Sequence, residues 1–161
     1  VEALYGISYT LKFMLKQRTE NPIDYAVMAL EGLWWVEDDN FDIRRKDKRK
    51  WTVMILQPQV ITRAVFEKGM ARLRKKRSDQ PVFSRLRLGD FEEGLCVQLM
   101  HIGPYATEPA SVDLMHAFAK QQGYHPRLGD GGKHHEIYLS DPRRAAPEKM
   151  KTILRHPVKP I

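Results

Sequence analysis

The chain is poor in cysteine and has no long apolar run. Among its 161 residues Cys96 is the one cysteine, which excludes an internal disulfide and fits a reducing cytoplasm. No apolar run approaches the ~18–20 residues that a membrane-spanning helix needs. The amino end shows no charged segment followed by an apolar one, as a secretion signal would. The sequence therefore predicts a cytoplasmic protein without a membrane partner.

Several motifs of enzyme chemistry are also missing. There is no Ser-His-Asp order for nucleophilic catalysis and no glycine-rich loop for phosphate. His134 and His135 are adjacent, and adjacent side chains of a strand diverge; no histidine pair has the His-x-x-x-His spacing of a zinc-binding helix. Cys96 lies between Leu95 and Val97, a setting typical of an inert core thiol. We expect neither a metal ion nor a cofactor.

Negative charge is scarce relative to positive charge. The net charge is +7, and the excess is concentrated at residues 44–50 and 72–77. Such runs can bind phosphates. However, the first falls in an expected hairpin loop and the second at the carboxyl end of an expected helix, where cations meet the helix dipole favourably. No nucleic-acid motif or interleaved aromatic residues accompany them. We therefore do not expect nucleic-acid binding as the main function. Docking on DNA is an alternative that predicts steeply salt-dependent binding.

Length and composition indicate a globular chain with a substantial core. Hydrophobic residues make up 42% of the chain and charged residues 29%, which are ordinary globular values. Apolar periodicity and turn residues predict the elements. In chain order, we expect a helix at 2–17, strands at 25–36 and 51–56, a helix at 60–77, strands at 85–89 and 94–102, a helix at 108–122, a strand at 134–140, a helical turn from Pro147 and a strand at 152–158. Gly32, within the first strand, predicts a bulge or a close approach.

This order contains an internal repeat. The second half runs strand, helix, strand and strand, and the first half runs helix, strand and strand, which is the same order without its opening strand. We expect an α+β fold in which two pseudo-twofold modules share one antiparallel sheet and bury a common cleft. A single domain at 1–161 would hold module one at 1–58, a connecting helix at 60–77 and module two at 85–161. Since the chain begins within a helical pattern and without methionine, we expect its amino end to be truncated.

Residues 134–142 (HHEIYLSDP) place an acid in the middle of a half-buried strand. Because side chains alternate along a strand, Ile137 and Leu139 should point one way, toward helices, and Glu136 and Tyr138 the other way. A carboxylate beside a phenol is costly to bury unless a ligand uses it. The alternative is a solvent-exposed outer face, since alternation is the usual strand pattern.

Five stretches of the chain carry a family resemblance. They are residues 30–35 (LEGLWW), 101–105 (HIGPY), 134–144 (HHEIYLSDPRR), 147–149 (PEK) and 151–158 (KTILRHPV). Together and in this order they resemble the GyrI-like small-molecule-binding proteins, and most closely the stand-alone bacterial branch that includes cyclopropanoid cyclopropyl hydrolases. The block at 134–144 is long and specific, whereas Gly-Pro-Tyr alone would be weak. The missing opening strand departs from the family pattern.

The resemblance implies both a fold and a function. The family fold is two strand-helix-strand-strand modules around a pseudo-twofold axis, with a ligand cleft between them. Family members bind bulky, flat, often cationic aromatic molecules around a central buried glutamate. The hydrolase branch opens the strained cyclopropane of genotoxic natural products with water. By this resemblance Glu136 occupies the position of the central glutamate, and the expected partner is an aromatic or cationic small molecule. The oligomeric state stays open.

The expected chemistry centres on Glu136. Burial in an apolar cleft should raise its pKa and suit it to act as a general base on water. That water would attack a cyclopropane carbon conjugated to a carbonyl. We expect Tyr105 to orient the water or to donate to the developing oxyanion. The alternative function is a non-catalytic module that senses or sequesters drugs, with Glu136 as counter-ion and aromatic side chains for cation–π contacts.

Further ligand-binding side chains are expected on neighbouring strands. Trp34 and Trp35 should face opposite sides, so that one lines the cleft and the other packs in the core. Glu31 shares the face of Trp35 and is either a second polar wall or the partner of an arginine outside the cleft. Tyr138 suits stacking on a ligand. Met100 suits a permissive ligand wall, with plain core packing as the alternative.

Overall fold

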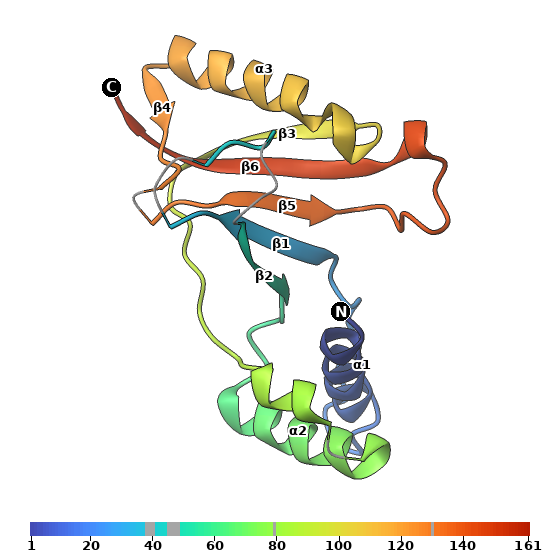
Figure 1. Ribbon diagram of the computed structural model, residues 1–161. Coiled ribbons are helices and arrows are strands. Elements are labelled where there is room, and N and C mark those ends of the chain that lie inside the picture. The colour runs from blue at the N-terminus through green and yellow to red at the C-terminus, as the bar shows by residue number, and fades with distance from the viewer. Residues whose placement is uncertain (38–40, 45–48, 79, 130) are drawn as a thin grey trace. The chain divides into compact units, whose positions relative to one another are not determined.

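The computed structural model describes residues 1–37, 41–44, 49–78, 80–129 and 131–161, and Figure 1 shows its helices and strands. The elements are α1 (Glu2–Lys16), β1 (Leu30–Trp35), β2 (Lys50–Ile55), α2 (Arg63–Arg77), η1 (Pro81–Arg85), β3 (Cys96–Ile102), η2 (Tyr105–Thr107), α3 (Glu108–Gln121), β4 (Tyr124–Pro126), β5 (His134–Tyr138), η3 (Pro147–Lys149) and β6 (Lys151–Pro160). None of the described helices is long and apolar enough to cross a membrane. The cytoplasmic location stays a prediction.

The expected α+β class with an antiparallel sheet is confirmed, with three differences in the elements. No strand forms at 85–89: Arg85 ends a short 3₁₀ helix that begins at Pro81, and residues 86–89 have no regular structure. The first strand begins at Leu30 and is shorter than expected. A short strand, β4, was not predicted, and it pairs with the far end of β6. Three residues carry too little periodicity to be recognised before their partner strand is known.

The described residues form two compact units, and each is considered by itself. The first holds residues 1–29 and 54–91, and the second holds residues 30–53 and 92–161. The expected module boundaries and the single domain stay predictions.

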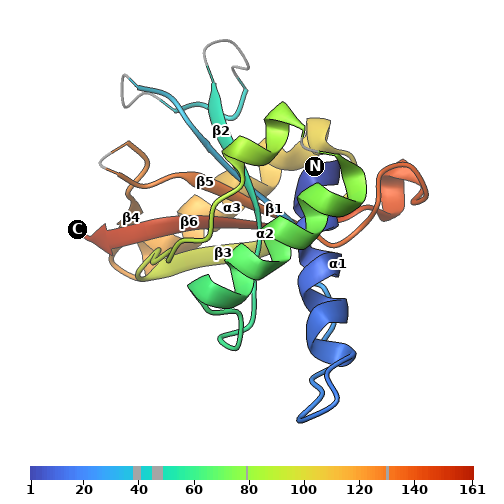
Figure 2. The same cartoon turned by 90° about the horizontal axis from the view of Figure 1, so that it is seen from below.

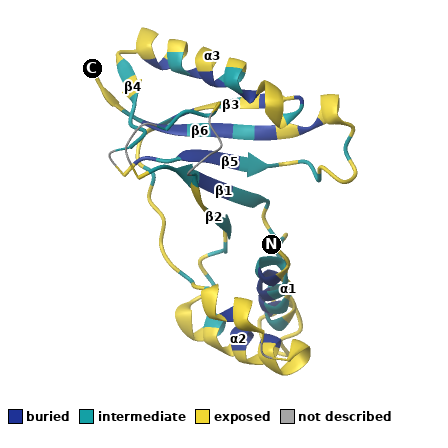
Figure 3. Cartoon of the chain, viewed as in Figure 1, coloured by how far each residue is buried: buried dark blue, intermediate teal, exposed yellow. Residues whose placement is uncertain are grey.

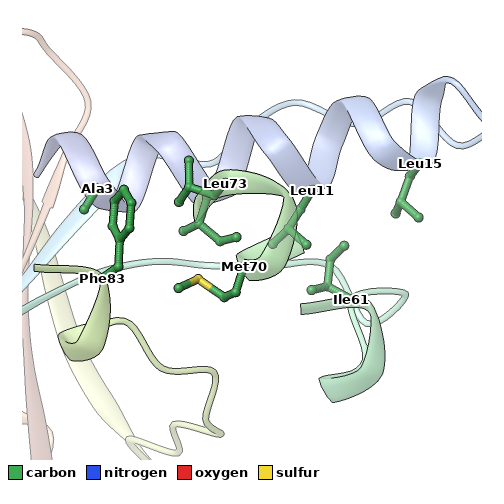
Figure 4. Close-up of a cluster of buried hydrophobic side chains, with 8 residues drawn as sticks. Ala3, Leu11, Leu15, Ile61, Met70, Leu73 and Phe83 are labelled. Carbon is green, nitrogen blue, oxygen red and sulfur yellow. The ribbon is translucent and has the colours of Figure 1, made fainter. Parts of the chain in front are cut away.

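The first unit is built on the packing of α1 against α2. Figure 4 shows the apolar side chains that line one side of α1 and meet side chains from α2 and its flanking segments. The cluster consists of Ala3, Ile7, Leu11, Leu15, Ile61, Met70, Leu73 and Phe83. The members from α1 recur every four residues, which places them on one face of the helix. Thr62 caps α2, since its side chain accepts a hydrogen bond from the amide of Val65.

Gly69 allows the two helices to approach closely. A Cβ built at this position would lie 2.6 Å from Leu11 Cδ2, and Leu11 is fully buried in a protein interior, where packing is close. The absence of a side chain at residue 69 is therefore a packing requirement.

Gly69→Val is expected to lower the free energy of unfolding by about 1–3 kcal/mol, because the added atoms overpack the contact with Leu11. Urea unfolding followed by circular dichroism measures the change. Gly89→Ala is the matched control, since a Cβ at Gly89 would meet nothing within 4 Å. Equal stability of the two variants would contradict this account of the helix contact.

The second unit is built on a six-stranded sheet in which β1, β5, β6 and β3 lie side by side in the order β2-β1-β5-β6-β3, with β4 attached to β6 (Figures 1 and 2). The pairings of β1 with β5, β5 with β6, β3 with β6 and β4 with β6 are all antiparallel. Helix α3 packs on β3 and β4. Figure 3 shows that the buried residues of α3 lie on the side toward the sheet. Val112, Met115 and Ala119 of α3 meet Val97 and Leu154 of the sheet.

The sheet register decides which residues share the face covered by α3. Glu136 pairs with Leu154 on one side and with Gly32 on the other. Directly opposed residues of an antiparallel pair share a face, and Leu154 packs on α3. Glu136 therefore lies on the face that α3 covers. The expectation that Ile137 faces a helix and Glu136 faces away from it is wrong for this helix.

Candidate functional site

Glu136 is buried at the centre of the sheet. It lies in the middle of β5, between β1 and β6, and only 7% of its surface is exposed. Its Oε1 accepts a hydrogen bond from Nε2 of His134, 2.9 Å away. The two side chains share a face because they stand two residues apart on one strand. A buried carboxylate with one strong donor is the core of the candidate site.

Aromatic side chains surround this carboxylate. Tyr138 follows Glu136 on the same face and donates a hydrogen bond to it. Tyr105, at the start of η2, meets the Tyr138 ring edge-on with 6.0 Å between centroids, and it is 38% exposed. Trp34 also shares this face, because its partner in β5 is His134. In this site the hydroxyl-bearing ring of Tyr105 is accessible to solvent, whereas the carboxylate of Glu136 is almost completely buried.

Gly32 leaves room over Glu136. It is the residue of β1 directly opposite Glu136, and a Cβ built on it would lie 2.8 Å from Tyr138 Oη and 2.9 Å from Trp34 Nε1. The expected close approach at Gly32 is therefore present, and it brings polar atoms of two aromatic side chains together.

Glu108 is a second buried carboxylate that the sequence analysis missed. It begins α3 and is 3% exposed. One ligand atom each from Glu108, His134 and Glu136 lie within 4.8 Å of one another. The available signal was an acid at a helix start, where negative charge is favourable. That signal is common on surfaces and says nothing about burial.

These three residues are not assigned as a metal site. Nδ1 of His134 lies 2.6 Å from Nε2 of His156, and Nε2 of His134 bonds Glu136. Both imidazole nitrogens are therefore engaged, and a metal ion would have to replace one of these bonds. The absence of a metal stays a prediction.

The electrostatics differ from those expected. Burial by itself would raise the pKa of Glu136, but the hydrogen bond and charge of His134, the hydrogen bond of Tyr138 and the charge of Arg49 together hold the pKa below its ordinary value. The prediction of a raised pKa is wrong because it counted burial without partners. Burial and the charge of Glu136 raise the pKa values of Tyr138 and Tyr105. The site therefore presents a carboxylate beside two protonated phenols.

The structure brings Trp34, Tyr105 and Tyr138 to Glu136 and leaves three other expected residues on the opposite face of the sheet. Those three are Glu31, Trp35 and Met100. Glu31 pairs with Ile137, and Met100 with Ile153, each of which neighbours a residue of the Glu136 face. Side-chain alternation therefore prevents these three from sharing one ligand-contacting face with Glu136.

On that opposite face, Glu31 takes part in a buried ion triad. His135 is 1% exposed, and its Nε2 donates to Glu31 while its Nδ1 donates to Glu93, at 2.8 and 2.9 Å. Burial would lower the pKa of His135, but the hydrogen bonds and charges of the two carboxylates raise it overall. Trp35 instead lies beneath the ammonium of Lys133, 4.2 Å from the ring centroid. Among the described residues, Glu31 thus pairs with a histidine and with no arginine.

The basic run at 72–77 belongs to the first unit, whereas the run at 44–50 includes Arg49, whose charge acts on Glu136. The exposed last turn of α2 consists of Arg74, Lys75, Lys76 and Arg77. Positive charge at the carboxyl end of a helix interacts favourably with the helix dipole. Residues 45–48 of the other run lie outside the described residues. Binding to nucleic acid stays unexpected and untested.

The family model for the GyrI-like small molecule binding domain matches residues 3–159, so the chain belongs to this family. Among solved structures, an uncharacterized conserved protein from Listeria innocua is 46% identical over 98% of this chain and 78% of its own, with a TM-score of 0.88. A protein described as a hydrolase from the same organism is 43% identical over 98% of this chain and 77% of its own, with a TM-score of 0.83. No match is found among curated proteins. The chain therefore carries a small-molecule-binding domain.

Acid should remove stability that depends on ionised Glu136. Because its folded-state pKa lies below the ordinary 4.5, its contribution is present above pH 4.5 and is lost as the pH falls through the folded-state value. The wild type should lose free energy of unfolding more steeply than Glu136→Gln below pH 4.5, as measured by urea unfolding across pH. Glu148→Gln, at an exposed glutamate, should behave like the wild type. Parallel curves for wild type and Glu136→Gln would contradict the pKa direction.

Proposed function

We propose that this domain binds bulky aromatic molecules against Glu136 and hydrolyses cyclopropane-containing members of that class. The observation that carries the proposal is the pair of buried carboxylates, Glu108 and Glu136, next to the partly exposed Tyr105. Two acids in different surroundings are the usual equipment for moving protons to and from a reacting molecule. The substrate class, cyclopropane-containing aromatic molecules, is taken from the resemblance of this chain to the hydrolase branch of the family.

The reaction would proceed by attack of water on the strained ring. Glu136 takes a proton from water as the water oxygen bonds a cyclopropane carbon. The ring C–C bond breaks, and its electron pair moves to the conjugated carbonyl oxygen. Tyr105 donates a hydrogen bond to the resulting oxyanion. The proton on Glu136 then passes to that oxygen, so the product is the substrate plus one water.

The lowered pKa of Glu136 changes how much of the rate acceleration each catalytic group must supply. A carboxylate held below its ordinary pKa is ionised at neutral pH and ready to accept a proton, but it is a weaker base than the raised-pKa carboxylate expected from sequence. General-base help typically supplies about 10²–10⁴-fold. Ring strain and the oxyanion contact must therefore provide the remaining acceleration.

The similar proteins support a hydrolytic function without specifying a substrate. Two of the Listeria innocua structures are described as hydrolases, and they share 43% and 45% identity with this chain. The description belongs to those proteins. Its value here is that the same fold, matched over nearly the whole chain, is associated with hydrolysis.

A non-catalytic binding function is the second candidate, and one observation favours it. Glu136 stays ionised beside aromatic side chains, which is the arrangement that holds an organic cation by charge and by cation–π contact. In that case the domain would sequester or sense flat aromatic cations, and Glu136 would be their counter-ion.

Incubation with a cyclopropane-bearing aromatic compound tests hydrolysis. The wild type should add one water to the compound, detected by mass spectrometry, and Glu136→Gln should lower the rate by roughly 10²–10⁴-fold because the base is lost. Tryptophan fluorescence measures whether the variant still binds the uncharged compound, which it should. Glu148→Gln should turn over like the wild type. Full turnover by Glu136→Gln would exclude it as the base.

Binding of a flat aromatic cation tests the second function. Glu136→Gln should weaken binding of a quaternary aromatic cation by about 1–3 kcal/mol, because the buried counter-charge is removed. It should leave an uncharged aromatic of the same size nearly unaffected. Isothermal titration calorimetry measures both. Equal weakening of the two ligands would show that the variant disturbs the site and not its charge.

A further inference from the structure

Three imidazoles form a continuous hydrogen-bonded chain that ends on Glu136. Nε2 of His116 lies 2.7 Å from Nδ1 of His156, and Nε2 of His156 lies 2.6 Å from Nδ1 of His134. Nε2 of His134 lies 2.9 Å from Oε1 of Glu136. The four residues come from α3, β6 and β5, so the chain runs from the helix across two neighbouring strands.

The hydrogen-bonded row of histidines has a buried inner end and a more exposed outer end. His134 and His156 are completely buried, at 0% exposure, whereas His116 on α3 is half-buried. The ring of Phe41 stacks on His134, 5.3 Å between centroids, and covers the inner end. His116 is therefore the member closest to solvent.

The protons on the three imidazoles can be arranged in two ways that satisfy every hydrogen bond of the row. In the first, each histidine is neutral and donates from Nε2, so that every proton points toward Glu136. In the second, His134 donates from both nitrogens, while His156 and His116 carry their protons on Nδ1. The two arrangements differ by one proton, which is gained or lost at Nδ1 of His116.

The surroundings keep the middle of this chain neutral. Burial, reinforced by its two histidine neighbours, lowers the pKa of His156 to about 2, so this ring passes protons without storing one. At the outer end, burial lowers the pKa of His116 while Asp113 opposes that shift; Asp113 in turn bonds Arg44 at 2.7 Å.

At the inner end, charged and phenolic groups hold Glu136 in its ionised form. They are Arg49 and Tyr138, in addition to His134. Glu108 is the further carboxylate close to this end of the chain. Among the described residues, the hydrogen-bonded path consists of the three histidines and Glu136, so the groups around its two ends set the position of the proton.

We propose that His134, His156 and His116 form a proton relay between Glu136 and solvent. When Glu136 takes a proton from water, His134 passes its Nδ1 proton to Nε2 of His156. His156 passes its Nδ1 proton to Nε2 of His116, and His116 releases its Nδ1 proton to solvent. One proton enters the Glu136 end and one leaves at His116, no bond between heavy atoms changes, and the reverse sequence restores the first state.

This exchange keeps the buried pair neutral during a reaction. Before it, Glu136 is anionic and His134 is cationic; after it, both are uncharged. Without the relay, protonation of Glu136 would leave the His134 cation buried and unpaired, which is costly. The use of the relay in turnover rests on the proposed function, but the relay itself does not.

Nitrogen-15 NMR of the imidazoles tests the relay without any substrate, since the nitrogen shifts report which ring nitrogen carries the proton. As the pH is lowered and Nδ1 of His116 takes up a proton, His156 should switch from the Nε2-protonated to the Nδ1-protonated form. In His116→Ala this switch should be absent. A wild-type His156 that keeps one tautomer while His116 titrates would overturn the relay.

Turnover of the cyclopropane-bearing compound tests what the relay does. His116→Ala should lower kcat roughly tenfold or more with KM unchanged, and imidazole added to the buffer should restore it, because proton transfer and not folding is impaired. His125→Ala, at an exposed histidine of β4, is the control and should match the wild type. An unchanged kcat, or a loss that imidazole does not restore, would overturn the catalytic role. A wild type that binds the compound without hydrolysing it would overturn the proposed function, and the NMR titration would still decide the relay.

Discussion

The second unit of this protein depends on how a carboxylate is kept ionised in the middle of a β-sheet. Removing a charge from water is costly unless hydrogen bonds and opposite charge replace the lost hydration. Glu136 obtains these from His134, Tyr138 and Arg49. Each of them is brought near by the sheet: two are on the same strand, and Arg49 immediately precedes β2. The fold and the site therefore require one another, because the partners converge only when the strands are correctly paired.

Local pattern predicted the fold well where an element carries its own periodicity. The apolar spacing of α1 and the residues that flank α3 needed no tertiary information, and these helices form within a residue or two of the expected bounds. The failures came where pairing partners decide the outcome. β4 pairs with the far end of β6, a contact that no local pattern predicts. Residue 85 of the expected strand at 85–89 instead ends a 3₁₀ helix.

The candidate site was predicted as a set of residue types and not as a geometry. Alternation placed Glu136 beside Tyr138 correctly, but it could not say which side of a neighbouring strand meets that face, so Trp34 and Trp35 stayed equivalent until the pairing of Trp34 with His134 was known. The same gap left open whether Glu31 and Met100 line the cleft, because the sequence does not show which face of each strand meets Glu136. The predicted pKa of Glu136 was wrong for a related reason. The sequence indicates that Glu136 is buried, but it does not show which side chains are oriented to donate hydrogen bonds to it.

The adjacent histidines of β5 have a consequence for how this sheet can form. His134 points to the face of Glu136 and His156, and His135 points to the opposite face, where Glu31 and Glu93 hold it. A slip of β5 by one residue would exchange the two faces, because side chains alternate with a period of two. Both polar networks would break in the same step, and Ile137 would exchange places with a buried charge. The pair of histidines thus acts as a register lock that excludes misaligned sheets before any ligand is bound.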